Sequence, residues 1–229
     1  MIELINTRPA PEVLQCIKMS KQNKSKITVA EIGIGYGGTT LGILKTLCKD
    51  DCLYLFDLEE KLTELTSDIV RDKLDNGVTI VPLGNTRKAG DSYAWTMGKL
   101  ALELNSLNGN PRLFDVVYLD GAHTFLHDAA TCCLLKQMLN YGGLIVFDDM
   151  YWSLEESPTQ NPRVNPGVKT KYTDDQIVTP HVNMIVDLFV RNDPSFEQVF
   201  LGENKTPWRA VFSKKLPPDV DTTTPLCQI

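Results

Sequence analysis

The chain has 229 residues, of which 42% are apolar, and a formal net charge of −6 at pH 7. This size suits one α/β domain with a buried core. The negative charge, with no basic cluster longer than Lys214-Lys215, argues against a nucleic-acid partner, because that affinity depends on clustered Lys and Arg. Without a long apolar run, a signal peptide or a CxxC pair, we expect no membrane partner and a cytoplasmic location.

Apolar strand patterns alternate with helical patterns between residues 27 and 147. The expected strands are 27–32, 52–56, 78–82, 114–119 and 144–147, and the expected helices between them are 39–47, 59–75, 92–105 and 125–139. Strands separated by helices of this length predict a doubly wound, mostly parallel α/β sheet, a Rossmann-like arrangement with helices on both faces.

The pattern changes after Met150. Residues 153–173 contain three prolines and show no periodicity, which is typical of a lid or substrate loop, here placed at 150–179, or of disorder. A helical pattern returns over 174–191. Two short strand candidates, 196–201 and 208–212, predict an antiparallel C-terminal edge. We expect a single domain over residues 1–216 and a disordered Pro/Thr-rich tail over 217–229.

The most informative stretch is the run EIGIGYG, residues 31–37, where an apolar strand meets three alternating glycines just before a helix. Such a turn lets a ligand approach the main chain and the helix N-terminus. Gly33, Gly35 and Gly38, with Asp57 after the next strand, also fit a dinucleotide site. Glu31 favours a different cofactor, because a carboxylate in this crevice would repel a pyrophosphate and attract a cationic ligand.

This run resembles the first motif, E-x-G-x-G-x-G, of class I S-adenosylmethionine-dependent methyltransferases. The resemblance implies that Glu31 lies in the cofactor crevice and that Gly33, Gly35 and Gly37 pass beneath the methionine part of the cofactor. It also implies that Asp57 accepts the ribose hydroxyls. The adenine would then lie beside Gly84, Asn85 and Thr86. We expect Asp120, at another strand end on the same crevice, to border the cofactor as well.

Three carboxylates follow two further expected strands: Asp120 after one, and Asp148 and Asp149 after the next. The carboxyl ends of neighbouring parallel strands open on the same crevice, so these side chains could converge. An all-oxygen set suits Mg²⁺ or another hard divalent cation. The alternative is that these residues cap a helix or stabilise a turn.

The segments DGAH (120–123), GG (142–143) and DD (148–149) resemble metal-dependent O-methyltransferases of the macrocin and mycinamicin sugar type and of cephalosporin tailoring. The resemblance implies that Asp120, Asp148 and Asp149 bind Mg²⁺ and that His123 is the general base, with Asp120 also catalytic. That family often has Glu-Asp where this chain has Asp-Asp, so Asp148 matches the family's metal ligands less well than Asp149 does.

The expected function is Mg²⁺-dependent methylation of a hydroxyl on a small molecule, a sugar or a natural product, with S-adenosylmethionine as donor. An NAD-dependent oxidoreductase and a non-catalytic cofactor-binding protein are the alternatives. Relatives of this type often self-associate, which leaves a homo-oligomer open. Two other histidines are weaker candidates for a functional role. We expect His127 to be a surface residue and His181 to lie on the substrate side. Tyr151 and Trp152 could form an apolar wall over the acceptor or only fill the core.

Overall fold

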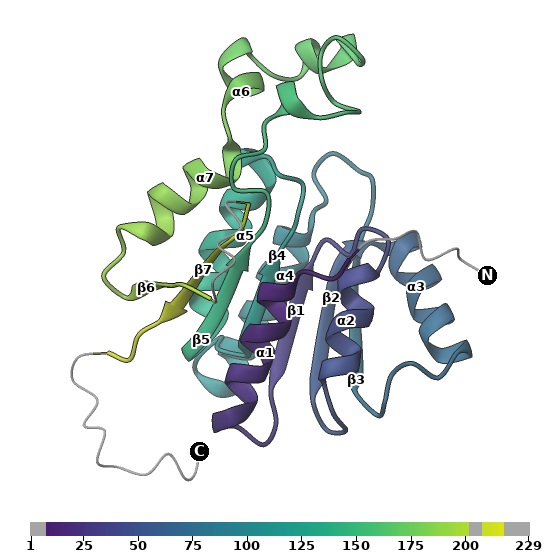
Figure 1. Cartoon of the computed structure of the whole chain (residues 1–229), viewed down its shortest axis with the longest axis vertical. Helices are drawn as coiled ribbons and strands as arrows, with labels where there is room; N and C mark the ends of the chain where they lie inside the picture. The colour runs from purple at the N-terminus through teal and green to yellow at the C-terminus, as the bar shows by residue number, and fades with distance from the viewer. Residues whose placement is uncertain (1–7, 202–207, 218–229) are drawn as a thin grey trace.

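The computed structural model of the chain describes residues 8–201 and 208–217. Its described elements are arranged around one seven-stranded sheet with strand order β3-β2-β1-β4-β5-β7-β6 (Figure 1). The strands are β1 (Thr28–Ile32), β2 (Cys52–Leu58), β3 (Thr79–Asn85), β4 (Phe114–Leu119), β5 (Leu139–Phe147), β6 (Phe196–Val199) and β7 (Ala210–Lys214). The first five are parallel, while β7 pairs antiparallel with both β5 and β6. The predicted parallel sheet and its antiparallel edge are therefore confirmed.

Helices cover both faces of the sheet, and each face has its own apolar core. The helices are α1 (Pro11–Asn23), α2 (Gly38–Thr46), α3 (Glu59–Arg71), α4 (Tyr93–Asn108), α5 (Phe125–Met138), α6 (Asp174–Val178) and α7 (His181–Val186). Side chains of α1, α2 and α3 pack on one face, and side chains of α4, α5 and α7 pack on the other. Successive residues of β4 alternate between the two cores, Val116 facing one and Val117 the other.

Several boundaries differ from the sequence expectation for local reasons. β2 runs on to Leu58, so Asp57 lies inside the strand, and β5 begins at Leu139 because that residue pairs with Phe114. The expected helix over 174–191 is broken at Pro180, which separates α6 from α7, and it continues as a π-helical turn over Asp187–Arg191. Helix α1 was not predicted.

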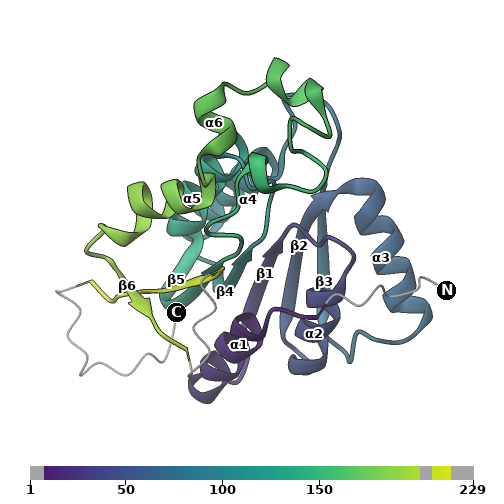
Figure 2. The same cartoon turned by 45° about the horizontal axis from the view of Figure 1, so that its top comes forward.

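Residues 151–180, here called the cap, stand above the carboxyl ends of the strands (Figures 1 and 2). Within the expected unpatterned stretch, residues 153–173, the structure forms two 3₁₀ turns, Leu154–Glu156 and Pro166–Thr170, and α6 follows where a helical pattern was expected. Leu154, Val168 and Ile177 form a small apolar core of the cap, and the rings of Trp152 and Tyr172 pack against it.

Both ends of the cap are hydrogen-bonded to the sheet domain. The Met150 N–H donates to the carbonyl of Trp208 at 3.0 Å. At the other end, His181 Nδ1 accepts from the Phe125 N–H at 3.1 Å, and Nε2 donates to the Gln176 carbonyl at 2.8 Å. His181 is buried, so it connects the cap to α5 and does not face a substrate.

The expected tail over 217–229 lies outside the described residues except for Pro217. Within residues 8–201 and 208–217, the helices are too short or too polar to cross a lipid bilayer.

Candidate active site

The glycine run forms a tight turn between β1 and α2. Gly33, Gly35 and Gly37 all have positive φ angles, between 52° and 83°. A Cβ on Gly33 would overlap the carbonyl oxygen of Asp120, and one on Gly37 would lie 2.7 Å from a methyl group of Leu65. A Cβ on Gly35 would meet nothing within 4 Å. Two of these glycines are therefore needed for packing and all three for backbone conformation.

A cavity of about 570 Å³ opens beside this turn, at the carboxyl ends of β1 to β4. Its volume is within the usual range for small-molecule sites. Seven of the predicted site residues line it: Gly33, Gly35, Asp57, Asn85, Thr86, Asp120 and His123. Glu31, Gly37 and Gly84 are not on its wall. The cavity also continues to His127, whose Nδ1 pairs with the Thr124 hydroxyl at 2.8 Å.

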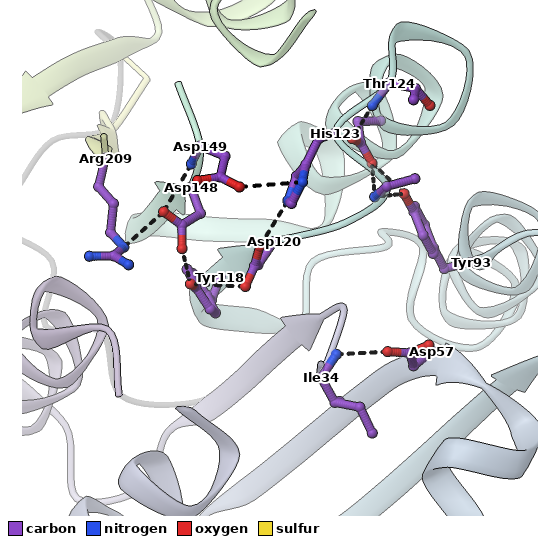
Figure 3. A network of polar contacts seen from close by, with 12 residues as sticks. Ile34, Asp57, Tyr93, Tyr118, Asp120, His123, Thr124, Asp148, Asp149 and Arg209 are labelled. Carbon is purple, nitrogen blue, oxygen red and sulfur yellow. Dashed lines mark hydrogen bonds and ion pairs between the residues drawn. The ribbon is translucent and has the colours of Figure 1, made fainter. Parts of the chain in front are cut away.

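Asp57 and Asn85 carry polar atoms that could serve a bound cofactor. Asp57 Oδ2 accepts from the Ile34 N–H at 2.9 Å and lies 3.5 Å from Lys61 Nζ (Figure 3). Oδ1 of the same side chain accepts from the Leu58 N–H at 2.6 Å. Asn85 is buried, and its Oδ1 has no hydrogen-bond partner among the described residues. A buried acceptor without a partner is costly, so this oxygen fits a ligand donor at the cavity wall.

A second group of side chains lies where β4 and β5 end (Figure 3). His123 Nε2 is 2.9 Å from Asp120 Oδ1, and His123 Nδ1 is 3.4 Å from Asp149 Oδ2. One ligand atom from each of these three residues lies within 4.8 Å of the others. The structure therefore brings together two of the three predicted carboxylates, with the predicted base between them.

Asp148 is directed away from this group. Its Oδ1 lies 3.0 Å from Arg209 Nε and its Oδ2 accepts a hydrogen bond from the Tyr118 hydroxyl. Consecutive residues after a strand tend to point in opposite directions, and here Asp149 faces the histidine while Asp148 faces the partly buried Arg209 (Figure 3).

Comparison with known proteins identifies the family. Residues 30–150, more than half of the chain, match the family model of a methyltransferase domain. The chain belongs to the methyltransferase-domain family.

Solved structures show the same fold at low sequence identity. An O-methyltransferase from Bacillus cereus, in complex with SAH, is 12% identical over 92% of this chain and 84% of its own, with a TM-score of 0.54. TomG, a Streptomyces achromogenes O-methyltransferase of tomaymycin synthesis in complex with SAM, is 13% identical over 91% and 82%, with a TM-score of 0.53. A protein from Klebsiella pneumoniae, provisionally classed as an O-methyltransferase, is 15% identical over 93% and 83%, with a TM-score of 0.56. No curated protein sequence matches the chain.

In this methyltransferase, burial changes the expected character of Glu31. Only 1% of Glu31 is exposed, and its Oε2 has no hydrogen-bond partner among residues 8–201 and 208–217. Burial, followed by the charges of Asp120 and Asp57, raises the pKa of Glu31 to about 8. The predicted carboxylate is thus a protonated acid at pH 7, behind the cavity wall.

His123 is also protonated, but the cause is the negative charge of its neighbours and not burial. Burial alone would lower its pKa, but the hydrogen bond to Asp120 and the charges of Asp120 and Asp149 outweigh burial and raise the pKa to about 9. An imidazolium can donate from both ring nitrogens, which matches the carboxylate on each side. Burial also raises the pKa of Asp149, with the charges of Asp148 and Asp120 acting in the same direction.

Sequence reasoning missed several residues of this methyltransferase that contact the site. Arg209 lies far along the chain from Asp148, and its own position carries no recognisable motif. Tyr93, Tyr118 and Asp128 form hydrogen bonds around the two loops, yet each belongs to an ordinary helix or strand pattern. Of the two aromatic residues after the acidic pair, Trp152 packs edge-to-face on His123, with ring centroids 5.4 Å apart and planes at 65°, whereas Tyr151 is exposed.

Proposed function

We propose that the protein is an S-adenosylmethionine-dependent O-methyltransferase that uses Mg²⁺ and acts on a hydroxyl of a small molecule, a sugar or a natural product. The observation that carries this proposal is that Asp120, His123 and Asp149 lie together, the first two on the wall of the glycine-lined cavity. Solved structures of this fold with SAM or SAH bound give it support. Membership of a methyltransferase family does not favour the oxidoreductase alternative.

The cofactor would lie along the cavity. Asp57 has carboxylate lone pairs beyond those used by two backbone N–H groups, and these can accept from ribose hydroxyls. Asn85 Oδ1 can accept from the adenine amino group or another donor, and Thr86 lies beside it. Gly35, whose Cβ position is open, leaves the main chain accessible to the methionine part.

The acceptor hydroxyl would lie where this cavity meets Asp120, His123 and Asp149, three residues here called the acidic group. Asp120 and Asp149 supply carboxylate oxygens for a hard divalent cation, and Asp148 is not part of the proposed set because its oxygens are already engaged. When bound, Mg²⁺ would act as a Lewis acid that lowers the pKa of a hydroxyl. Compensation of the Asp120 and Asp149 charges would remove the cause of the raised pKa of His123, so that the ring can accept the proton.

The remaining rate enhancement would come from positioning. Methyl transfer needs the acceptor oxygen in line with the sulfonium, and good orientation can supply about 7–11 kcal/mol of a barrier. The cap stands over this region, and Trp152 joins it to His123. We propose that the cap is the acceptor lid and that its surface determines which acceptor is methylated.

The cofactor proposal can be tested by calorimetry with S-adenosylhomocysteine and NAD⁺ on wild type, Gly33→Ala and Gly98→Ala. We expect wild type to bind S-adenosylhomocysteine only. Gly33→Ala should abolish binding, because the new Cβ overlaps Asp120 and φ is +83°. The matched control, Gly98→Ala, places its Cβ 3.9 Å from the nearest side chain and should bind normally. Binding of NAD⁺ alone would contradict the proposal.

The metal and acceptor proposals need a turnover assay. Labelled S-adenosylmethionine is incubated with a panel of hydroxylated sugars and natural products, with Mg²⁺ or with EDTA. We expect turnover to need Mg²⁺ and to fall at least 100-fold in Asp149→Asn, while affinity for S-adenosylhomocysteine stays within about twofold. Asp72→Asn, at an exposed acid after α3, serves as control. Full activity in EDTA would rule out the metal.

A further inference from the structure

Two residues of the acidic group have an unusual backbone conformation. His123 has φ of +55° and Asp149 has φ of +50°, both in the left-handed region that side-chain-bearing residues rarely adopt. They lie on different loops, one after β4 and one after β5, and their side chains face each other. Such conformations persist only where the surroundings fix them. Each of the two loops is hydrogen-bonded by one buried tyrosine–aspartate pair.

The first pair is Tyr93 of α4 with Asp128 of α5, joined by a hydrogen bond from the hydroxyl to Asp128 Oδ1. The Tyr93 oxygen also accepts from the Ala122 N–H at 2.8 Å, and Asp128 Oδ2 accepts from the Thr124 N–H at 3.1 Å. The pair therefore binds the backbone immediately before and immediately after His123. Two helices from one face of the sheet fix this loop.

The second pair is Tyr118 of β4 with Asp148, joined by a hydrogen bond from the hydroxyl to Asp148 Oδ2. Asp148 Oδ1 accepts from the Asp149 N–H at 2.9 Å, and the ion pair with Arg209 neutralises its charge. The Tyr118 hydroxyl also lies 3.2 Å from Asp120 Oδ2. This pair therefore contacts the carboxylate of Asp120 and the backbone of Asp149, from the side opposite to the histidine (Figure 3).

We propose that the pairs Tyr93–Asp128 and Tyr118–Asp148 are positioning groups for the reaction. The first fixes the His123 ring through its loop, and the second fixes Asp149 through its backbone and Asp120 through its carboxylate. Both oxygens of each aspartate accept hydrogen bonds from the partner tyrosine or from the loop backbone. This inference rests on the proposed function, because it assigns the pairs to the same acidic group.

The test removes one hydroxyl at a time and keeps the ring. Tyr93→Phe and Tyr118→Phe each disrupt one pair, and Tyr54→Phe on β2 is the matched control, because its ring packs on Phe114 away from the site. The first measurement is the NMR spectrum of the histidine rings at one fixed pH in EDTA, where the chain has only three histidines to assign. We expect the His123 ring signals to shift or broaden in both pair variants and His181 to stay unchanged.

The second measurement is binding of Mn²⁺ and of S-adenosylhomocysteine to the same proteins. We expect Mn²⁺ affinity to fall about 10- to 100-fold in Tyr118→Phe, the usual effect of losing a group that orients metal ligands. Affinity for S-adenosylhomocysteine should stay within about twofold in this variant, because Tyr118 does not line the cavity. Tyr93 does line the cavity, so the Tyr93→Phe variant is judged on the NMR signals of the His123 ring.

The outcomes separate this inference from the proposed function. Wild type that fails to bind Mn²⁺ would contradict the metal site, and the ring spectra, recorded without metal, would still decide the positioning role. Ring signals of His123 that match wild type in both pair variants, or that move equally in Tyr54→Phe, would overturn the inference. A change in thermal stability alone, with unchanged spectra, would do the same, because it would show a purely structural role.

Discussion

At the scale of single residues, the main feature is a histidine held between two carboxylates beside a buried glutamic acid. His123 takes a proton because Asp120 and Asp149 surround it, and Glu31 keeps one because burial disfavours its charge. Both groups bind protons more tightly in the folded protein than in the unfolded chain. The metal-free protein should therefore lose stability as pH rises through their pKa values.

The predicted pH dependence follows from this. The ordinary pKa of histidine is 6.5 and that of His123 is about 9, so its contribution to stability is full below pH 6.5 and is lost as pH rises to 9. Asp149→Asn removes one of the charges that raise the pKa and should flatten the loss in that window. Urea unfolding in EDTA at several pH values between 6 and 9 measures it.

Glu31 contributes with the same sign at lower pH, between 4.5 and about 8. Glu31→Gln should remove that part and leave the fall that His123 causes between pH 6.5 and 9. An Asp149→Asn protein with the wild-type slope above pH 8 would show that Asp149 does not affect the titration of His123.

At the scale of elements, the cap is a separate packing unit. Its apolar core forms a cluster distinct from the two cores of the sheet. The rings of Trp152 and Tyr172, which pack on this core, also contact His123 and His181 outside the cap. Loss of a contact in the cap should therefore open the cap locally and leave the sheet folded.

Adjacent residues of α6 provide the test. Ile177 is 5% exposed and Val178 is 53% exposed. Ile177→Ala should destabilise the closed cap by about 2–5 kcal/mol, the usual cost of such a truncation in a core, while Val178→Ala should have little effect. Limited digestion with trypsin measures this, because Arg163, Lys169 and Lys171 lie in the cap. Equal cleavage rates for the two variants would contradict a separately packed cap.

At the scale of the whole molecule, Arg209 connects parts of the chain that are far apart in sequence. Its Nη1 lies 3.2 Å from Glu12 of α1 and its Nε lies 3.0 Å from Asp148 after β5. All three side chains are largely buried, so each charge depends on the others. Arg209, which immediately precedes β7 of the antiparallel edge, thereby stabilises both α1 and the loop after β5.

Arg209→Met should lower the free energy of unfolding by about 3–5 kcal/mol, because it leaves two buried carboxylates without their cation. Arg71→Met is the control: this arginine of α3 is largely exposed and pairs with Asp68 and Asp72, so its loss should cost at most about 1 kcal/mol. Urea unfolding at pH 7 compares the two. A small and equal loss would mean that the Arg209 ion pairs add little to stability.

Much of the fold follows from local sequence, and less of the site does. Alternating strands and helices predicted the sheet, and the glycine turn marked the cavity, because both depend on neighbouring residues. The opposite orientations of Asp148 and Asp149 could not be predicted, since they depend on Arg209 and Tyr118. Likewise, the burial of Glu31 depends on packing between elements, which a single strand pattern does not contain.

The anchored ends of the cap have a consequence for how the molecule can diversify. Met150 is hydrogen-bonded to Trp208, and His181 to Phe125, so the intervening chain leaves and rejoins the sheet domain at fixed points. A replacement segment of another length or sequence would need to satisfy these two junctions and the contact of Trp152 with the His123 ring, and would leave the glycine-lined cavity intact. On the proposed role of the cap as acceptor lid, replacement of this segment would change which acceptor is methylated while the rest of the methyltransferase domain is kept.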